Sequence, residues 1–164
     1  VFITVTDSVK GWLEKDLADV IFGERGFIEE DEYEIIMKDR YVAVLQKGML
    51  PGCRSVNIEE LYSFPYISTN QKLVDQDIDQ SKFSEILYCN SSDDTSIVSM
   101  VKEGVGIAVL PSLSLKNAIQ GIKVVNITPG IYRYIVFAHR RKNPAAVRFV
   151  EFMKNYIKQK IERR

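Results

Sequence analysis

Few side chains in this sequence are suited to catalysis, and none of them falls into a catalytic motif. His139 is the single histidine, the side chain that proteins use most often as a general acid or base. It follows a predicted strand and precedes Arg140, Arg141 and Lys142. A serine nucleophile would need a Gly-x-Ser-x-Gly elbow, which the sequence lacks. We therefore predict no catalytic residue and an ordinary strand-end role for His139.

Metal binding has equally little support. Cys53 and Cys89 lie 36 residues apart, without the Cys-x-x-Cys spacing or neighbouring histidine of a zinc site, and we expect them to be free thiols. Three aspartates, Asp75, Asp77 and Asp79, resemble the first three ligands of a calcium loop. However, Gln80 and Ile86 stand where such a loop requires glycine and a bidentate glutamate. We predict a solvated acidic face and no metal.

A nucleotide cofactor is not expected either. Gly104 and Gly106 precede a predicted strand, whereas the glycines of a dinucleotide fingerprint follow one, and Val109 occupies the third glycine position. The acidic pair Asp93 and Asp94 lies at a predicted helix start, where carboxylates cap free N–H groups and favour the helix dipole. We therefore expect no cofactor, and a binding function is left.

Three loops carry the polar side chains that a small-molecule site needs. They are Thr6–Ser8, Ser68–Asn70 and Asn90–Ser96, each of which follows a predicted strand. In open α/β sheets, ligands bind beyond the carboxyl ends of strands, where loops lead into helix N-termini. Hydroxyl, amide and carboxylate groups in these loops predict contacts with a polar ligand.

The elements that position these loops alternate between strand and helix. Residues 1–6 and 18–22 read as strands around a short helix that begins near Ser8, a parallel βαβ unit. A second such unit runs from strand 85–89 through a helix capped by Ser92 or Asp93 to strand 107–110. Further strands are predicted at 33–37, 41–46, 65–68, 122–127 and 132–137, and short helices at 58–63 and 112–118. Asn143, Pro144 and a regular apolar stripe predict a long terminal helix.

Composition and charge fit one globular domain. The chain has 164 residues, 46% of them hydrophobic, with 22 basic and 22 acidic side chains. Net neutrality argues against a nucleic-acid-binding surface on the whole chain. The charges are nevertheless separated, because residues 1–82 carry a net charge of −7 and residues 83–164 carry +7. The positive excess lies in His139–Arg164, and we expect it to attract the acidic segment Glu24–Glu34.

Several segments together resemble one family. The motifs are DTSIVSMVKEGVGIAVLP at residues 94–111, IYRYIVFAHRRKNPAAVRFVEFMKNYI at 131–157, WLEKDLADVIFGE at 12–24, YVAVLQKGML at 41–50 and ELYSFPYIS at 60–68. In this order they resemble the effector-binding domain of LysR-type transcriptional regulators. The resemblance implies an α/β fold with two Rossmann-like lobes of the periplasmic-binding-protein type II kind and a ligand cleft between them. Lobe one would comprise residues 1–43 and 131–164, and lobe two residues 44–130.

The resemblance also implies a site and partners. The effector contacts carried over by position are Thr6, Ser68, Thr69, Asn70, Asn90, Ser92, Asp94 and Thr95. The partner would be a small-molecule effector, with DNA bound only through a winged helix-turn-helix that this chain lacks. We expect the parent regulator to be cytoplasmic and bacterial, and a homodimer or tetramer.

One departure and two alternatives accompany this interpretation. Family domains open with a strand and a helix before the segment that matches residues 1–6, so we expect an N-terminal truncation that affects ligand binding and dimerisation. One alternative is an extracytoplasmic solute-binding protein of the same fold. The other is an enzyme, for which His139 would be the candidate. No apolar run approaches the about 20 residues of a membrane span, and we expect no membrane contact.

Overall fold

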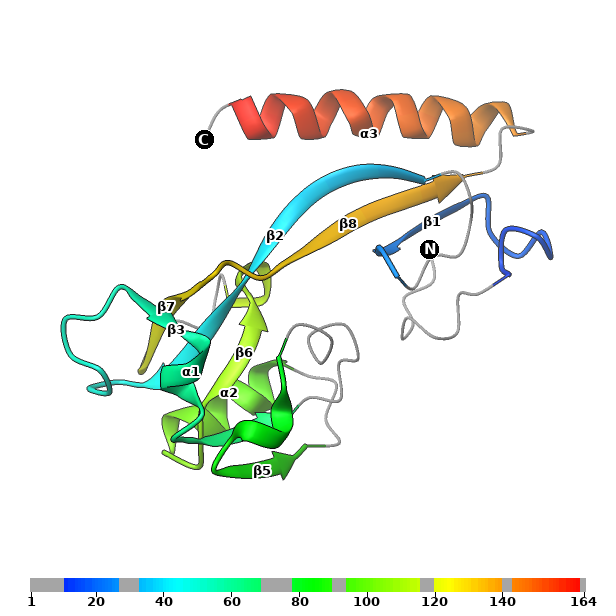
Figure 1. The fold of residues 1–164 in the computed structure, drawn as a ribbon. Helices are drawn as coiled ribbons and strands as arrows, with labels where there is room; N and C mark the ends of the chain where they lie inside the picture. Colours follow the sequence, from blue (N-terminus) through cyan, green and yellow to red (C-terminus); the bar gives the residue numbers. More distant parts are fainter. Residues whose placement is uncertain are drawn as a thin grey trace. The chain divides into compact units, whose positions relative to one another are not determined.

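The chain forms two compact units. The computed structural model describes residues 11–26, 33–68, 78–89, 94–115, 120–139 and 143–162 (Figure 1). Unit 1 comprises Val1–Lys38 and Tyr134–Arg164, and unit 2 comprises Asp39–Arg133. The polypeptide therefore passes between the units twice, after residue 38 and after residue 133. Each unit is compact through its own internal contacts.

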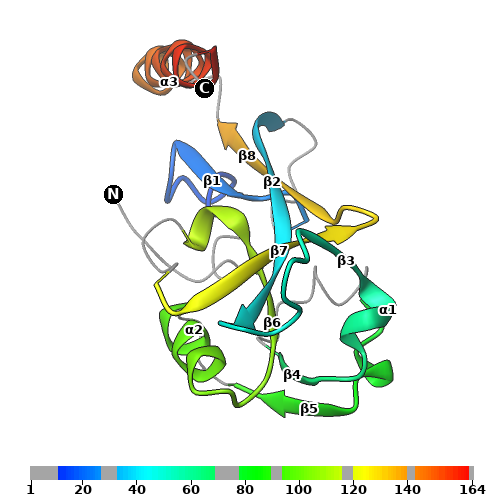
Figure 2. The same ribbon diagram turned by 90° about the vertical axis from the view of Figure 1, so that its left-hand side faces the viewer.

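Unit 2 contains a mixed sheet built around strand β2 (Tyr33–Gln46), most of which belongs to this unit. Strand β6 (Ala108–Pro111) pairs with β2 antiparallel, as does β7 (Ile122–Thr128), and β3 (Ser55–Asn57) extends the sheet parallel to β7. A second, parallel pair consists of β4 (Pro65–Ser68) and β5 (Glu85–Tyr88) (Figure 2). Tyr66 forms a parallel bridge to Ile107, so β4 also lies beside the start of β6.

Short helices connect these strands. They are α1 (Ile58–Leu61), η2 (Gln80–Lys82), α2 (Asp94–Lys102) and η3 (Ser112–Leu115). Helix α1, predicted at residues 58–63, begins with a reciprocal capping box between Asn57 and Glu60. Helix α2 lies between β5 and β6 in the sequence, as predicted, and buries Ile97, Val98 and Val101.

Strand β2 is buried on both faces inside unit 2. Tyr41, Ala43 and Leu45 belong to one hydrophobic cluster, and the alternate residues Val42 and Val44 belong to the other. This alternation follows from the period of two in a strand. Because both faces are covered, the sequence YVAVL is continuously apolar instead of alternating with polar residues. The two clusters together form the core of this unit.

Unit 1 has a smaller core. Strand β1 (Val20–Glu24) pairs antiparallel with β8 (Tyr132–His139), and helix α3 (Pro144–Glu162) lies alongside (Figure 1). Its buried cluster consists of Leu13, Ile21, Val136 and Ala138. Strand β1 ends the order of the sheet, so among the described residues its outer edge has no partner strand.

The structure confirms the predicted terminal helix and corrects the reading of residues 33–46. Asn143 accepts a hydrogen bond from the Ala145 N–H at 2.9 Å, as an N-cap residue does. Residues 33–37 and 41–46, predicted as two strands, form the single strand β2. Residues 1–10 lie outside the described part of the chain, and residues 11–16 form turns where the short helix beginning near Ser8 was predicted to continue, so that prediction is wrong for these residues. Pairing of the predicted first strand is therefore still a prediction, as are the lobe boundaries near residues 43 and 131.

Candidate functional site

Two of the three predicted loops begin at neighbouring strand ends. The parallel strands β4 and β5 end together, with Ser68 opposite Tyr88 in the register. One residue further along, the Cys89 N–H donates a hydrogen bond to the Ser68 carbonyl oxygen at 3.0 Å. The segments that begin at Thr69 and Asn90 therefore leave the sheet from adjacent positions. This is the edge at which ligands bind in open α/β sheets.

Gly106 permits the close approach of β6 to β4, and Gly104 ends the helix that precedes β6. Gly104 has φ +76° directly after α2, and the Val105 N–H bonds back to the Met100 carbonyl, a glycine-dependent helix end. A Cβ on Gly106 would lie 2.7 Å from the Pro65 carbonyl oxygen. The close approach permits two hydrogen bonds of 2.8 Å, Ile67 N–H to Ile107 O and Ile107 N–H to Pro65 O. The Gly-x-Gly sequence is thus explained by packing and not by phosphate binding.

Helix α2 provides the third part of this edge. Asp94 is its first residue and is half-buried, while Thr95 is exposed in the first turn. A carboxylate at a helix N-terminus interacts favourably with the helix dipole, as predicted for Asp94, whereas Asp93 lies outside the described residues. Buried Ile97 and Val98 anchor the following turn to the core.

Three of the eight predicted contacts lie in the described part of the chain. Ser68 is 1% exposed at the end of β4, and Asp94 and Thr95 begin α2. Thr6, Thr69, Asn70, Asn90 and Ser92 lie outside the described residues. Their contact with a ligand stays a prediction, as it does for the three placed residues.

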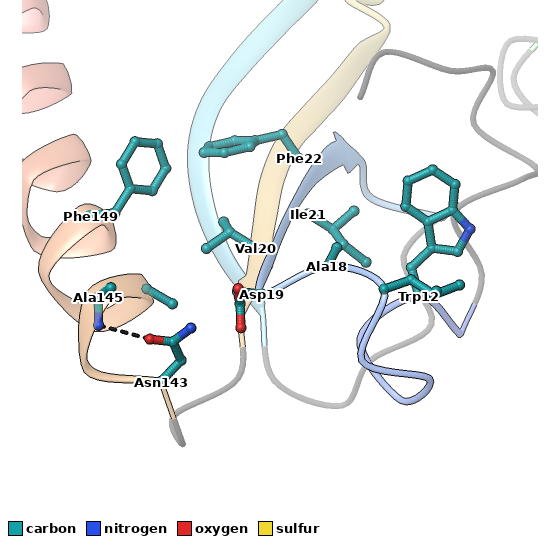
Figure 3. A pocket seen from close by; sticks show the side chains of 11 residues that line it. Trp12, Ala18, Asp19, Val20, Ile21, Phe22, Asn143, Ala145 and Phe149 are labelled. Carbon is teal, nitrogen blue, oxygen red and sulfur yellow. Dashed lines mark hydrogen bonds between the residues drawn. The ribbon is translucent and has the colours of Figure 1, made fainter. Parts of the chain in front are cut away.

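A pocket that sequence reasoning missed lies within unit 1. It has a volume of about 520 Å³ between the turn at Trp12, strand β1 and the start of α3 (Figure 3). Its lining is mainly apolar, and Phe22 of β1 meets Phe149 of α3 edge to face at 6.2 Å. Asp19 and Asn143 are its polar lining residues, and the Asn143 side chain caps α3. The pocket combines residues 12–22 with residues 143–149, two segments far apart in the sequence, which left no local signal.

A buried polar cluster in unit 2 was also missed. Asp39 is 2% exposed. One carboxylate oxygen accepts hydrogen bonds from Ser112 Oγ at 2.8 Å and the Leu113 N–H at 3.3 Å, and the other lies 2.9 Å from Arg133 Nε. An acidic residue two positions before the buried run at residues 41–45 was the available signal, since buried carboxylates require partners.

Two other titratable residues from the sequence analysis, His139 and Asp79, lie at the ends of secondary-structure elements. His139 ends β8, and among the described residues nothing hydrogen-bonds to its buried Nδ1. Hydrogen bonds from the Ser81 side chain, at 2.6 Å, and backbone lower the pKa of Asp79, which caps η2. Asp75 and Asp77 lie outside the described residues.

Within the described ranges, no group of three or more His, Cys, Asp or Glu residues could hold a metal ion. No helix described here is long and apolar enough to cross a membrane.

One curated protein similar to this chain is a longer transcriptional regulator. The chain is 27% identical, over 172 residues, to an uncharacterized HTH-type transcriptional regulator of Methanocaldococcus jannaschii. The match covers 92% of this chain and 57% of that protein. The chain therefore spans little more than half the length of the curated relative.

Solved structures share the fold at low sequence identity. The reduced OxyR regulatory domain of Pseudomonas aeruginosa matches with a TM-score of 0.73 and 20% identity, over 91% of this chain and 76% of that one. The effector-binding domain of QuiR in complex with shikimate gives 0.75 and 22%, over 95% and 79%. The Synechocystis CcmR regulatory domain in complex with 2-PG gives 0.74 and 15%, over 94% and 81%. These similarities confirm the predicted periplasmic-binding-protein-like α/β fold.

The family follows from the sequence match. Residues 1–158 match the model of the LysR substrate binding domain, nearly the whole chain. The resemblance predicted from five short motifs is thereby confirmed. This chain belongs to the LysR substrate-binding domain family.

Proposed function

We propose that this chain senses a small-molecule effector for a LysR-type transcription regulator. The observation that carries the proposal is the family match over residues 1–158, combined with two polar loops that leave adjacent strand ends. The full regulator would act in the cytoplasm as a homodimer or tetramer and bind DNA through a helix-turn-helix domain outside this chain. The name of the curated relative supports a regulator over the alternative of a solute-binding protein.

The proposed effector is a small polar molecule with at least one hydrogen-bond acceptor such as a carboxylate. Hydroxyl groups of Ser68 and Thr95 and backbone N–H groups at the start of α2 are the donors that would hold it. The further contacts would come from Thr6, Thr69, Asn70, Asn90 and Ser92. No covalent step is needed, so the chain would be a sensor without enzyme activity, cofactor or metal. Preferential binding to one conformation would shift the regulator between its states.

A thermal-shift screen tests this site. We would screen small hydroxylated carboxylates and phosphorylated acids, including shikimate and 2-PG, which two structural neighbours bind. A ligand at about 100 times its Kd stabilises the folded state by about 2.7 kcal/mol, which a rise in Tm reports.

The control variants decide where a hit binds. The Ser68→Ala, Thr95→Ala double variant should weaken binding of the hit. Ser99→Ala, one turn further along the exposed face of α2, should leave it unchanged, because Ser99 Oγ already donates to the Thr95 carbonyl oxygen. Equal affinity for wild type and the double variant would refute the proposed site.

A further inference from the structure

The pocket of unit 1 lies where strand β8 ends and helix α3 begins. The chain enters unit 1 at Tyr134, early in β8, and Val20 of β1 pairs with His139, the last residue of that strand. Val20 lines the pocket, as does Asn143 directly before α3. Every lining residue belongs to unit 1. The pocket therefore shares no residue with the candidate effector site.

Three aromatic side chains contribute to the walls of this pocket. They are Trp12, Phe22 and Phe149, and the last two rings meet edge to face (Figure 3). Phe22 and Phe149 nevertheless remain exposed, so their contact leaves part of each ring accessible. The volume of about 520 Å³ lies within the range of about 300–1,000 Å³ that is usual for small-molecule sites. The walls are therefore suited to a small molecule with an apolar body.

The polar part of the lining favours a positive charge. Asp19 is the single charged residue among the lining residues that the structure describes, and it is exposed. Within the described part of the chain, no hydrogen bond or ion pair engages its carboxylate. Aromatic faces attract cations through the negative charge of their π-systems, and a carboxylate adds direct attraction. Aromatic walls beside an unpaired carboxylate are thus the chemistry that recognises an organic cation.

We propose that the pocket of unit 1 binds an organic ammonium with an apolar body, of the arylalkylamine class. The apolar body would lie against Trp12, Phe22 and Phe149, and the ammonium group would pair with Asp19. The predicted strand at residues 1–6 is the competing occupant. It carries no charged side chain, however, and would leave Asp19 without a counter-charge. The proposal does not rest on the effector site, because the two sites share no residue.

The test compares three probes that share one aromatic ring and differ in charge. They are 2-phenylethylamine, the neutral 2-phenylethanol and the anionic phenylacetate. Trp12 is the single tryptophan and lines the pocket, so its fluorescence reports binding, and ligand-observed NMR gives an independent Kd. The amine should bind about fivefold more tightly than the alcohol, as an ion pair at an exposed carboxylate permits, and phenylacetate should bind most weakly.

The variants separate the charge from the aromatic wall. Asp19→Asn should abolish the preference for the amine over the alcohol, whereas Glu151→Gln, an exposed acid of α3 outside the lining, should leave it unchanged. Phe149→Leu keeps an apolar side chain and should weaken both probes, because each loses an aromatic contact. The Ser68→Ala, Thr95→Ala double variant should bind all three probes as wild type does. This last variant distinguishes the pocket from the candidate effector site.

Each contrary result has a definite meaning. Residues 140–142 are basic and directly precede Asn143, so tighter binding of phenylacetate than of the amine would show that they set the charge of the pocket, and would overturn the proposal. Binding of the amine only after deletion of residues 1–6 would show that the chain itself fills the pocket. The proposal is equally overturned if the amine does not bind by either measurement, or if Asp19→Asn keeps the preference for it.

Discussion

The two ends of strand β2 lie in contrasting surroundings. In unit 2, Ala43, Val44 and Leu45 are each 0% exposed and contribute to two clusters on opposite faces. In unit 1, the same strand begins at half-buried Tyr33, and Ile35 is 55% exposed. One continuous strand thus passes from a core covered on both sides to a region with large exposed apolar side chains. The contrast indicates that packing in unit 2 stabilises the strand. The stability of unit 1 depends more on its few aromatic contacts.

The largest effect is expected from the buried end of this strand. Leu45→Ala should lower the free energy of unfolding by about 2–5 kcal/mol, because it leaves a cavity between packed strands. Ile35→Ala, the matched truncation in unit 1, should cost about 0.5 kcal/mol or less. Chemical denaturation followed by far-UV circular dichroism checks both values. Trp12, the single tryptophan, lies in unit 1, so its fluorescence shows whether unit 1 unfolds separately. Equal losses for the two variants would contradict the contrast.

Overpacking of unit 2 should have the next largest effect. Gly106→Ala places a methyl group 2.7 Å from a main-chain oxygen of β4, which cannot rotate away as a side chain could. We expect a loss of about 1–3 kcal/mol from the displaced strands. Val105→Ala, at the preceding and exposed residue, serves as the control. If Gly106→Ala and the control Val105→Ala have the same Tm, β4 and β6 tolerate separation, and the core is less tightly packed than the 2.7 Å approach indicates.

An intermediate effect is expected in unit 1. Phe149→Ala removes the edge-to-face partner of Phe22, a contact worth about 0.5–1.5 kcal/mol beyond area burial. Trp12 fluorescence during denaturation should report the loss, because Trp12 lines the same pocket. The exposed Glu151→Ala variant of the same helix should behave like wild type. An unchanged midpoint for Phe149→Ala would mean that α3 contributes little to this unit.

The smallest effect should come from the ion pair between Lys154 and Glu34. Its atoms lie 2.5 Å apart, but the two side chains are 46% and 43% exposed. Lys154→Gln should change the free energy of unfolding by about 0–1 kcal/mol, as is usual for such pairs. The difference should disappear at about 1 M salt, where screening acts within about 3 Å. A difference that persisted in salt would show that the predicted attraction between acidic and basic segments is stronger than a surface contact.

Local sequence signals predicted the parts of the fold that local interactions determine. Helix α3 followed from Asn143, Pro144 and its apolar period, and α2 from its buried face and Gly104. Residues 33–46 were divided incorrectly because Lys38, Asp39 and Arg40 interrupt the apolar pattern. In the structure, the partners that satisfy Asp39 and Arg40 lie more than 70 residues away, at Ser112, Tyr132 and Arg133.

The same reasoning applies to the candidate site. The loops after β4 and β5 could be predicted because each follows an apolar run and is rich in hydroxyl and amide groups. Their adjacency depends on the parallel pairing of the two strands, which no sequence spacing specifies. The pocket of unit 1 was inaccessible to such reasoning, since Trp12, Phe22 and Phe149 line one pocket only after β1 and α3 have packed.

The outer edge of β1 has a consequence for the behaviour of this chain in solution. The Arg25 N–H donates to the Tyr134 carbonyl oxygen, so by alternation the main-chain groups of Val20 and Phe22 point away from β8. No described strand receives them, and Phe22 and Leu17 are 43% and 60% exposed nearby. Such an edge is a template for adding a strand from another molecule. The predicted strand at residues 1–6 would occupy this edge within the molecule, so we expect a variant without these residues to associate at high concentration through folded molecules that separate on dilution.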